Sequence, residues 1–318
     1  MDRQRLEELK SRIPLLDYLV GHDWKPMRQS PRGEIGGLCP LHAETRPSFW
    51  IHTRKNLFYC HGCGRGGDLI RFVECFHAVN FPQALAHLRR WMGAATLLAE
   101  TAAFYRLELH RSPEAVAYLA QRGLTDPVVI ERMGIGYARG GRLRQHLMDL
   151  GYSFAQIQQL GLINSRGWDT YYRRVVFPCG GNLYGRSIGG GAPHRFLARP
   201  KGGLYAWAQV QHAPAVIVVE GIFDVAALWQ AGFADATCAW GVHLNAVQRA
   251  QLATGRRTVW VAFDGDAPGA QAAQALTDDL RKDGQQAARV RLPPGQDVAS
   301  YFASGATSAD FQKLLVEA

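Results

Sequence analysis

The segments Cys39-Pro-Leu-His42 and Cys60-His-Gly-Cys63, with seventeen residues between them, decide how the first part of this 318-residue chain folds. Each segment places two potential metal ligands three positions apart, around a turn that contains Pro or Gly. Thiolates and imidazole are ligands that zinc prefers, and four protein ligands are typical of a structural zinc site. Reduced cysteines that only fill a hydrophobic core would have no reason to occur in two such pairs. The spacing therefore predicts one structural zinc ion with four ligands: Cys39, His42, Cys60 and Cys63.

Two short hydrophobic segments lie between the ligand pairs. Ser48–Ile51 and Asn56–Tyr59 are rich in aromatic residues, and a polar turn joins them. This pattern predicts the two strands of a zinc ribbon. We expect the zinc-ribbon domain to occupy residues 1–95, followed by a helical connector or linker in the Ala-rich stretch Gly93–Ala103.

Composition limits the other possibilities. The net charge of +9 and the pI near 9.4 fit a nucleic-acid partner, although the Arg-rich composition is equally typical of a GC-rich genome. No apolar run reaches the roughly 18 to 20 residues of a membrane span, and the first residues do not form a signal peptide, so we expect no membrane association. Outside the predicted zinc site, an odd number of cysteines argues against disulfides and for a reducing cytoplasm: Cys75, Cys179 and Cys238.

The residues from 212 onward alternate between strand and helix patterns. Ala215–Val219 and Thr258–Phe263 are continuous apolar runs, as expected of strands buried on both faces of a sheet. Helical patterns separate the strand segments at Phe223–Ala231, Asn245–Ala253 and Gly269–Lys282. This alternation predicts a mostly parallel sheet with right-handed crossovers.

The whole chain is thus expected to be a multi-domain α/β protein. Residues 104–211 mix helices with short strands such as Arg174–Pro178 and Asn182–Arg186, and they are predicted to form a second, mixed α+β domain. Residues 212–318 are predicted to form a third domain, which contains the parallel sheet. These boundaries rest on changes of pattern along the chain.

Acidic residues follow two of the predicted buried strands. Glu220 comes directly after Val219, and Asp264 and Asp266 follow Phe263. In a parallel sheet, functional residues gather beyond the carboxyl ends of the strands, so these carboxylates are expected to lie together. Like charges destabilise each other unless a cation neutralises them, and oxygen ligands suit magnesium or manganese. The sequence therefore predicts a divalent metal site at these three acids.

Two further acids could join this site, Asp224 one helical turn after Glu220 and Asp297 after the last predicted strand. The alternative role for all these acids is helix capping, which is common at strand-to-helix turns; for Asp224 the two roles stay equally open. A pair of divalent ions held by such acids would suit nucleotidyl transfer or phosphodiester hydrolysis. The chain has no Gly-x-x-x-x-Gly-Lys-Ser/Thr phosphate loop, which argues against a P-loop kinase or motor.

Three sets of residues, in one order along the chain, resemble the bacterial DnaG-type DNA primases. The predicted zinc element, with Arg46–Phe49 inside it and Gly66–Ile70 after it, resembles their CHC2 zinc-binding domain. Several middle segments look like the basic half of the primase core: Tyr118–Leu124, Ile135–Tyr137, Arg174–Pro178 and Arg195–Pro200. Glu220–Asp224 and Asp264–Ala272 resemble the Toprim domain, which these primases share with some topoisomerases and nucleases.

The resemblance implies template-directed synthesis of a short RNA primer on single-stranded DNA from ribonucleoside triphosphates. It implies that Glu220, Asp264 and Asp266 are the catalytic metal-binding acids. Asp224 and Asp297 match auxiliary acids, and the zinc domain matches one that helps to select the template sequence. The basic groove that would hold the template backbone includes or adjoins Arg173, Arg174, Arg195, Arg199 and Lys201.

Two departures from the family pattern bear on these expectations. Ala299 stands where the last acidic motif usually has a second aspartate, which argues against an additional metal ion there. The chain stops just after the Toprim match, so we expect a monomer that does not dock on a replicative helicase through this chain, either a stand-alone primase of a plasmid, phage or other mobile element or a truncated primase. The alternatives are a Toprim nuclease that uses the same acids and a non-catalytic, zinc-dependent single-stranded DNA-binding protein.

Overall fold

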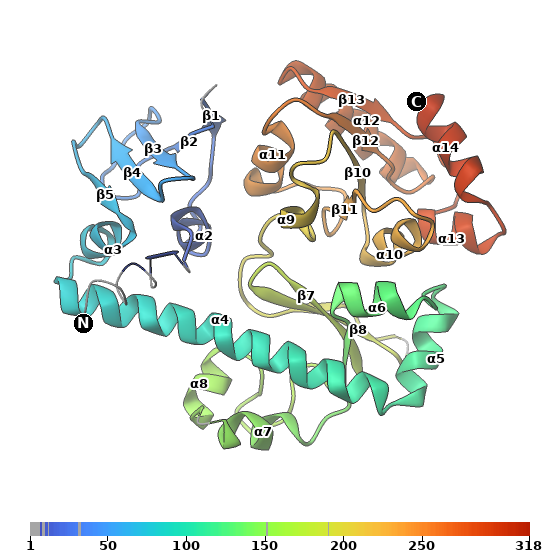
Figure 1. The fold of residues 1–318 in the computed structure, drawn as a ribbon, viewed down its shortest axis with the longest axis horizontal. Coiled ribbons are helices and arrows are strands. Elements are labelled where there is room, and N and C mark those ends of the chain that lie inside the picture. Colours follow the sequence, from blue (N-terminus) through green and yellow to red (C-terminus); the bar gives the residue numbers. More distant parts are fainter. Residues whose placement is uncertain (1–6, 8–9, 12, 31–32, 151, 190) are drawn as a thin grey trace. The chain divides into compact units, whose positions relative to one another are not determined.

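A computed structural model describes residues 7, 10–11, 13–30, 33–150, 152–189 and 191–318 of the chain (Figure 1). The chain divides into two compact units, Met1–Thr96 and Leu97–Ala318. The first unit holds a five-stranded antiparallel sheet, and the second holds one antiparallel and one parallel sheet of four strands each. The predicted multi-domain α/β class is therefore confirmed. The finer division at 1–95, 104–211 and 212–318 stays a prediction.

The sheet of the first unit is built from very short strands: β1 (Arg28–Gln29), β2 (Ile35–Gly37), β3 (Phe49–His52), β4 (Leu57–Cys60) and β5 (Gly66–Asp68). The predicted ribbon strands correspond to β3 and β4, which pair in antiparallel register with Phe49 opposite Cys60. Phe49 stacks on Phe58 and lies edge-on to Phe72, in a core shared with α2 (Leu15–Val20) and α3 (Leu69–His77). A core this small buries little apolar surface, so it contributes only limited stability without a further constraint.

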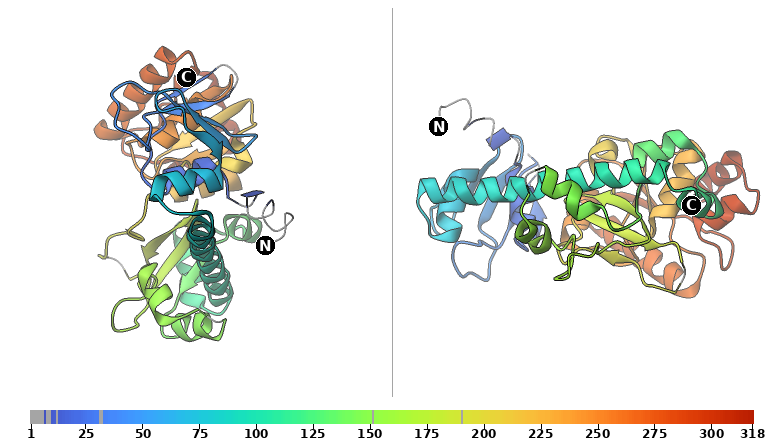
Figure 2. Two further views of the ribbon diagram at one scale, coloured as in Figure 1. Left: turned by 90° about the vertical axis from the view of Figure 1, so that its left-hand side faces the viewer. Right: turned by 90° about the horizontal axis from the view of Figure 1, so that it is seen from below.

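Helix α4 (Phe81–His110) runs without a break through the predicted connector, as Figure 2 shows. The stretch is rich in Ala and Leu, which favour helix, and its one glycine is Gly93. Leu85 belongs to the core of the first unit, and Tyr105 belongs to a core of the second. The boundary between the units therefore lies inside a helix. Neither α4 nor any other helix in the described part of the chain is long and apolar enough to cross a membrane.

The antiparallel sheet of the second unit has the strand order β6-β7-β8-β9. Its strands are β6 (Gly136–Ala138), β7 (Arg174–Cys179), β8 (Asn182–Ser187) and β9 (Arg195–Phe196). Its helices are α5 (Pro113–Gln121), α6 (Pro127–Met133), α7 (Leu143–Asp149) and α8 (Phe154–Gln159), whereas α9 (Trp207–Val210) packs in a core of the parallel sheet. Strand β7 is buried on both faces, because Val176 packs in a core with residues of α7 and α8, whereas Phe177 lies in the core next to the parallel sheet.

The parallel sheet has the strand order β11-β10-β12-β13. Its strands are β10 (Ala215–Val219), β11 (Ala236–Cys238), β12 (Thr258–Val261) and β13 (Gln286–Arg289). Its helices are α10 (Ile222–Gln230), α11 (Ala246–Ala253), α12 (Ala267–Lys282), α13 (Val298–Ala303) and α14 (Ser308–Val316). Val218 packs with residues of α11 and α12, whereas Val219 packs with residues of α10, α13 and α14. The continuous apolar runs in the sequence therefore correspond to strands covered by helices on both sides.

The topology of this sheet sets the place of its ligand site. From β10 the chain passes through α10 to the neighbour β11, and then through α11 to β12 on the other side of β10. Since α10 and α11 cover opposite faces, the carboxyl ends of β10 and β12 flank the point where the strand order reverses. Ligands of α/β sheets bind at such switch points. The acids Glu220 and Asp264 follow these two strands.

The contact between β6 and α4 generates a stability prediction. A Cβ atom at Gly136 would lie 2.5 Å from the backbone carbonyl carbon of Tyr105, so a side chain there must push the strand and the helix apart. We expect Gly136→Ala to lower the free energy of unfolding of the second unit by about 1 to 3 kcal/mol, measured by urea denaturation. Gly189→Ala is the matched control, because no atom lies within 4 Å of its Cβ position. Equal stability of the two variants would contradict the close packing described for β6.

Candidate functional site

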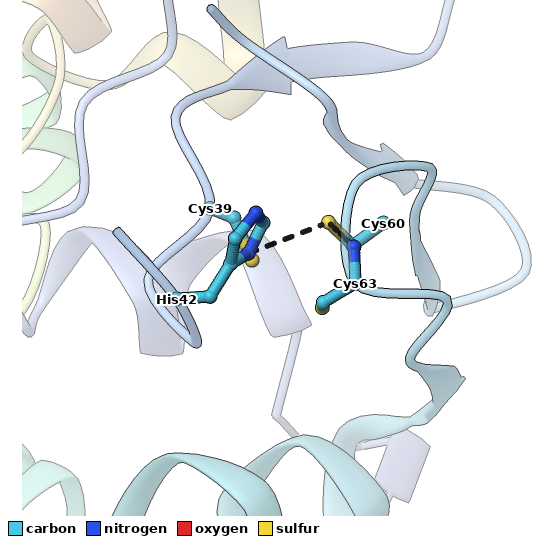
Figure 3. A group of neighbouring side chains, drawn as sticks. All are labelled: Cys39, His42, Cys60 and Cys63. Carbon is cyan, nitrogen blue, oxygen red and sulfur yellow. Dashed lines mark hydrogen bonds between the residues drawn. The ribbon is translucent and has the colours of Figure 1, made fainter. Parts of the chain in front are cut away.

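The four predicted zinc ligands converge in the first unit. Cys39 and His42 lie in the loop after β2, Cys60 ends β4, and Cys63 lies in the turn before β5 (Figure 3). Their ligand atoms all lie within 4.8 Å of one another, and the Nδ1 atom of His42 is 3.9 Å from the Sγ atom of Cys60. Among the described residues, no other group of three or more such side chains is as compact. Four sulfur and nitrogen donors at this spacing fit a tetrahedral zinc ion.

Backbone N–H groups support the sulfur atoms. The Leu41 N–H donates to the Sγ atom of Cys39, and the Cys63 N–H donates to that of Cys60, both at 3.4 Å. Burial raises the pKa of Cys39 to about 12. Burial also acts to raise the pKa of Cys60, but hydrogen bonding with the Ser48 hydroxyl and from the Cys63 N–H outweighs it and lowers that pKa. A divalent cation is the natural partner for buried sulfurs of this kind, because metal binding deprotonates the thiols.

The carboxylates of the second unit meet at the carboxyl ends of β10 and β12. The Asp264 N–H donates to the Oε1 atom of Glu220 at 3.1 Å. A Cβ atom at Gly269 would lie 2.9 Å from that same oxygen and 3.0 Å from Oδ1 of Asp266. Glycine at position 269 therefore allows α12 to begin directly beside both carboxylates. The three predicted catalytic acids lie together.

A second glycine brings the last acidic residue to this site. The Gly265 N–H donates to the carbonyl of Gln296 at 2.8 Å, and a Cβ atom at position 265 would lie 2.3 Å from the carbonyl oxygen of Pro293. A side chain at position 265 would push the loop from Pro293 to Asp297 away. The negative charge of Asp297 acts on both Glu220 and Asp264, so this loop adds a further carboxylate to the cluster.

The clustered carboxylates are strained electrostatically. Burial, followed by the negative charges of neighbouring acids, raises the pKa of Glu220 to about 7 and that of Asp264 to about 6. Such groups either keep a proton near neutral pH or need a cation beside them. The all-oxygen donor set fits a hard divalent ion such as magnesium or manganese.

Three of the acids also cap helices. Asp266 and Asp297 are the N-caps of α12 and α13, and their Oδ1 atoms accept backbone N–H groups at 2.7 and 2.6 Å. Asp224 is buried, and its two oxygens accept the N–H groups of Gly221 at 3.1 Å and Ala299 at 3.0 Å. Burial, and then the charge of Asp297, raises the pKa of Asp224 to about 7. Capping and metal binding are compatible, because each carboxylate oxygen can accept more than one interaction.

Basic side chains gather around His194 in the same unit. Burial, and then the positive charges of Arg186, Lys201 and Arg174, lower the pKa of His194. Arg174 is itself buried, and burial followed by the charge of Arg195 lowers its pKa. In the described part of the chain, none of these four cations forms a salt bridge with a carboxylate. The structure thus brings the predicted Arg174, Arg195 and Lys201 together and adds Arg186, which sequence reasoning did not select although it ends a predicted strand.

The two other predicted basic residues have different surroundings. Arg173 is exposed and lies near the hydroxyl of Tyr137, with a left-handed backbone (φ 53°) that changes the chain direction before β7. Arg199 is partly buried, which lowers its pKa. Among the described residues, neither of these two side chains forms a hydrogen bond or an ion pair with the group around His194.

A second basic surface was missed by sequence reasoning. The loop after β6 lies beside the loop before β7: the Arg173 N–H donates to the carbonyl of Ala138 at 2.7 Å, and the ring of Tyr172 lies against Gly140. Tyr172 and Trp168 are 62% and 67% exposed, so both rings are open to solvent on these loops. Four exposed arginines lie on these loops and the adjoining start of α7: Arg139, Arg142, Arg144 and Arg166. In the sequence, the pattern that could have indicated this surface is Arg and Gly interleaved with an aromatic residue.

Comparisons with known proteins agree with this arrangement. Three family models match in succession: the CHC2 zinc finger at residues 1–102, the N-terminal domain of the DNA primase catalytic core at 104–200, and a Toprim-like domain at 217–302. DNA primases from Synechocystis sp. and Pseudomonas putida are 26% and 31% identical, over 100% and 96% of this chain. The chain spans only 59% and 53% of the length of these two relatives.

Solved structures show the same fold. The zinc-binding and RNA polymerase domains of the Aquifex aeolicus primase match 98% of this chain and 84% of theirs, with a TM-score of 0.61 and 22% identity. A DnaG primase catalytic domain bound to single-stranded DNA matches 72% of this chain and 82% of its own, with a TM-score of 0.60 and 26% identity. A zinc ribbon, a mixed core and a Toprim-type sheet thus follow one another as in the primases compared. Along its length the chain is similar to the bacterial DnaG-type DNA primases, as the sequence predicted.

The zinc quartet generates a metal-removal prediction. Cys63→Ser should lose the zinc ion and unfold the ribbon locally, because so small a core depends on its metal. Metal analysis of purified protein should give one zinc per chain for the wild type and for the control Cys75→Ser, and none for Cys63→Ser. Full zinc content in Cys63→Ser, or none in the wild type, would refute the assignment of these ligands.

The raised pKa values of the acids generate a pH prediction. Unfolded carboxyl groups titrate near pH 4. Burial and neighbouring charges raise the pKa of Glu220 to about 7 and that of Asp264 to about 6, so the folded state binds more protons than the unfolded state in this window. The stability that these groups contribute is present below about pH 4 and is lost as the pH rises to about 7.

The measurement is the melting temperature of magnesium-free protein between pH 5 and pH 8. We expect it to fall more steeply with pH in the wild type than in Glu220→Gln, and magnesium to restore it at pH 8 only in the wild type. The comparison with the variant removes the contribution of the histidines, such as His194, whose lowered pKa has the opposite effect. Parallel pH profiles and no response to magnesium would contradict the proposed charge cluster.

Proposed function

We propose that this chain is a DNA primase, which synthesises short RNA primers on a single-stranded DNA template from ribonucleoside triphosphates. The observation that carries the proposal is the meeting of Glu220, Asp264 and Asp266 at the switch point of the Toprim-type sheet. The relatives named DNA primase and the primase domain solved with single-stranded DNA support the same reaction and the same template. We further propose that the protein acts as a monomer in the reducing cytoplasm, where its six free cysteines would persist.

The acids have the proposed role of holding magnesium or manganese. Glu220, Asp264 and Asp266 are the proposed ligands, with Asp224 and Asp297 as auxiliary ones. When bound, a pair of divalent ions would neutralise the negative charge on the attacking and leaving oxygens of a phosphoryl displacement. The raised pKa values of the buried acids support this role, since a cation relieves the repulsion that raises them.

The basic side chains have the proposed role of binding phosphate groups. Arg174, Arg195 and Lys201, together with Arg186, form a positive group in the same unit as the acids, which suits a triphosphate or a template backbone. The exposed Trp168 and Tyr172 offer flat surfaces on which unpaired bases can stack between the arginines of the neighbouring loops. Arg173 and Arg199 stay proposed template contacts from the resemblance.

The first unit has the proposed role of a zinc domain that helps to select the template sequence. We propose Cys39, His42, Cys60 and Cys63 as its zinc ligands, which their convergence supports. The nuclease and the non-catalytic binding protein are alternative uses of the same parts. They are less favoured, because the relatives that match 100% and 96% of this chain are named DNA primases.

One substitution separates the three functions. Asp264→Asn keeps the shape of the side chain and removes one negative charge from the proposed metal site. We expect primer synthesis on single-stranded DNA with labelled ribonucleotides to fall by about two orders of magnitude or more, because charge stabilisation in the transition state is lost. Binding of single-stranded DNA should remain and should weaken only with added salt, since it rests on the arginines.

The control for this assay is Asp283→Asn, which changes an exposed aspartate at the end of α12. Near wild-type primer synthesis by Asp264→Asn would refute the catalytic assignment. Labelled template fragments that depend on Asp264, without any new oligonucleotide, would identify a nuclease. Binding without either product in the wild type would identify a non-catalytic protein.

A further inference from the structure

Glu44 lies two residues after His42 and makes contacts that capping or solvation does not explain. Its side chain is only 11% exposed, although it lies in a loop. The Oε1 atom accepts the N–H of Cys39 at 2.7 Å and the N–H of Ser48 at 3.0 Å. The Oε2 atom accepts the Ser48 hydroxyl and lies 3.2 Å from the Nε2 atom of His42. One carboxylate thus connects a zinc ligand, the imidazole of a second ligand and the start of β3.

The two nitrogens of the His42 ring face different partners. Nε2 lies beside the Glu44 carboxylate, whereas Nδ1 lies 3.9 Å from the sulfur of Cys60, another member of the quartet. A neutral imidazole carries its one proton on either nitrogen and can bind a metal only through the other. A carboxylate accepts hydrogen bonds and cannot donate them, so it favours the tautomer with the proton on Nε2. That tautomer leaves the lone pair of Nδ1 directed at the zinc position.

The second pair of ligands is linked to the same carboxylate through Ser48. The Ser48 hydroxyl lies 3.2 Å from the sulfur of Cys60, and its oxygen accepts the N–H of Gly62 at 3.2 Å. A Cβ atom at position 62 would lie 2.7 Å from this hydroxyl and 2.8 Å from Nε2 of His42. The turn between Cys60 and Cys63 therefore packs directly on the polar groups that hold the histidine. This contact limits the space in which the imidazole could turn.

We propose that Glu44 is the positioning residue of the zinc site, which fixes the tautomer and the orientation of His42 so that Nδ1 binds the metal. The proposal rests on the zinc site proposed above and is independent of primer synthesis, because its tests measure zinc and the histidine ring. Glu44 is not one of the four residues of the quartet. It acts through His42, and the bonds to Cys39 and Ser48 keep its carboxylate in place. Partners of this kind typically change metal affinity by about 10- to 100-fold.

The first test is Glu44→Gln in the full chain. Glutamine has the same shape and can still accept the N–H groups of Cys39 and Ser48 through its oxygen, but its NH₂ group then faces Nε2 of His42. That group donates a hydrogen bond, so it favours the tautomer with the proton on Nδ1 and blocks the metal-binding nitrogen. We expect zinc transfer to a chromogenic chelator to be about 10- to 100-fold faster than in the wild type. The matched control is Glu74→Gln, which removes a carboxylate from α3 in the same unit and should leave zinc transfer unchanged.

A purely structural role for Glu44 predicts the same loss, so a double-mutant cycle is needed. His42→Cys replaces the imidazole by a thiolate, which binds zinc without a choice of tautomer. If Glu44 acts through His42, then adding Glu44→Gln to His42→Cys should change zinc transfer by less than about three-fold, a small part of its effect alone. This background also keeps the test valid if Glu44→Gln alone cannot hold zinc. An equal loss in both backgrounds would overturn the proposal, as would wild-type zinc transfer in Glu44→Gln.

The tautomer can also be observed directly. Nitrogen-15 NMR of zinc-loaded protein labelled at histidine should give His42 a protonated Nε2 and a metal-bound Nδ1, assigned by comparison with His42→Cys. A protonated Nδ1 in the wild type, with zinc bound through Nε2, would overturn the proposal even if Glu44→Gln released zinc faster.

Discussion

Both units depend on one constraint, which is the partial burial of acidic side chains: thiols in the first unit and carboxyl groups in the second. In the first unit, two short loops bring three sulfurs and an imidazole within 4.8 Å, and burial raises the pKa of Cys39. In the second unit, buried strands end in carboxylates whose pKa values rise to about 6 and 7. Folding alone leaves such groups protonated or in repulsion. A cation of the right hardness resolves both problems, because sulfur and nitrogen donors suit zinc in the first unit and carboxylate oxygens suit a hard divalent ion in the second.

The fold prepares the second site by removing side chains rather than adding them. Gly265 and Gly269 stand where a Cβ atom would lie 2.3 Å from a backbone oxygen of the next loop and 2.9 Å from Glu220. Because neither residue has a side chain, three separate segments can meet at the carboxyl ends of β10 and β12. The acids can then serve as helix caps and as metal ligands at once, which explains why sequence reasoning left the role of Asp224 open. Backbone N–H groups hold both of its oxygens.

Much of this could be predicted from the sequence because the decisive signals are local. Ligand spacing located the zinc quartet, apolar runs located β10 and β12, and acids after those runs located the cluster. Contacts between segments far apart in sequence gave no such signal. Arg186 joins Arg174 and Lys201 only because strands β7 and β8 pair and the chain returns beside them. Trp168 and its neighbouring arginines lie on loops, which have no periodic sequence pattern. Glu44 looks like any other loop carboxylate in the sequence, and only its contacts in the structure distinguish it.

The most direct test of the account is anomalous X-ray scattering from a crystal of the chain grown with manganese and no added zinc. Data collected at the zinc and manganese absorption edges locate both ions independently of any assay. The account predicts a zinc peak among Cys39, His42, Cys60 and Cys63, and a manganese peak among the carboxylates of the Glu220 cluster. Manganese elsewhere on the second unit, or a zinc peak at the carboxylates with none at the cysteines, would contradict it.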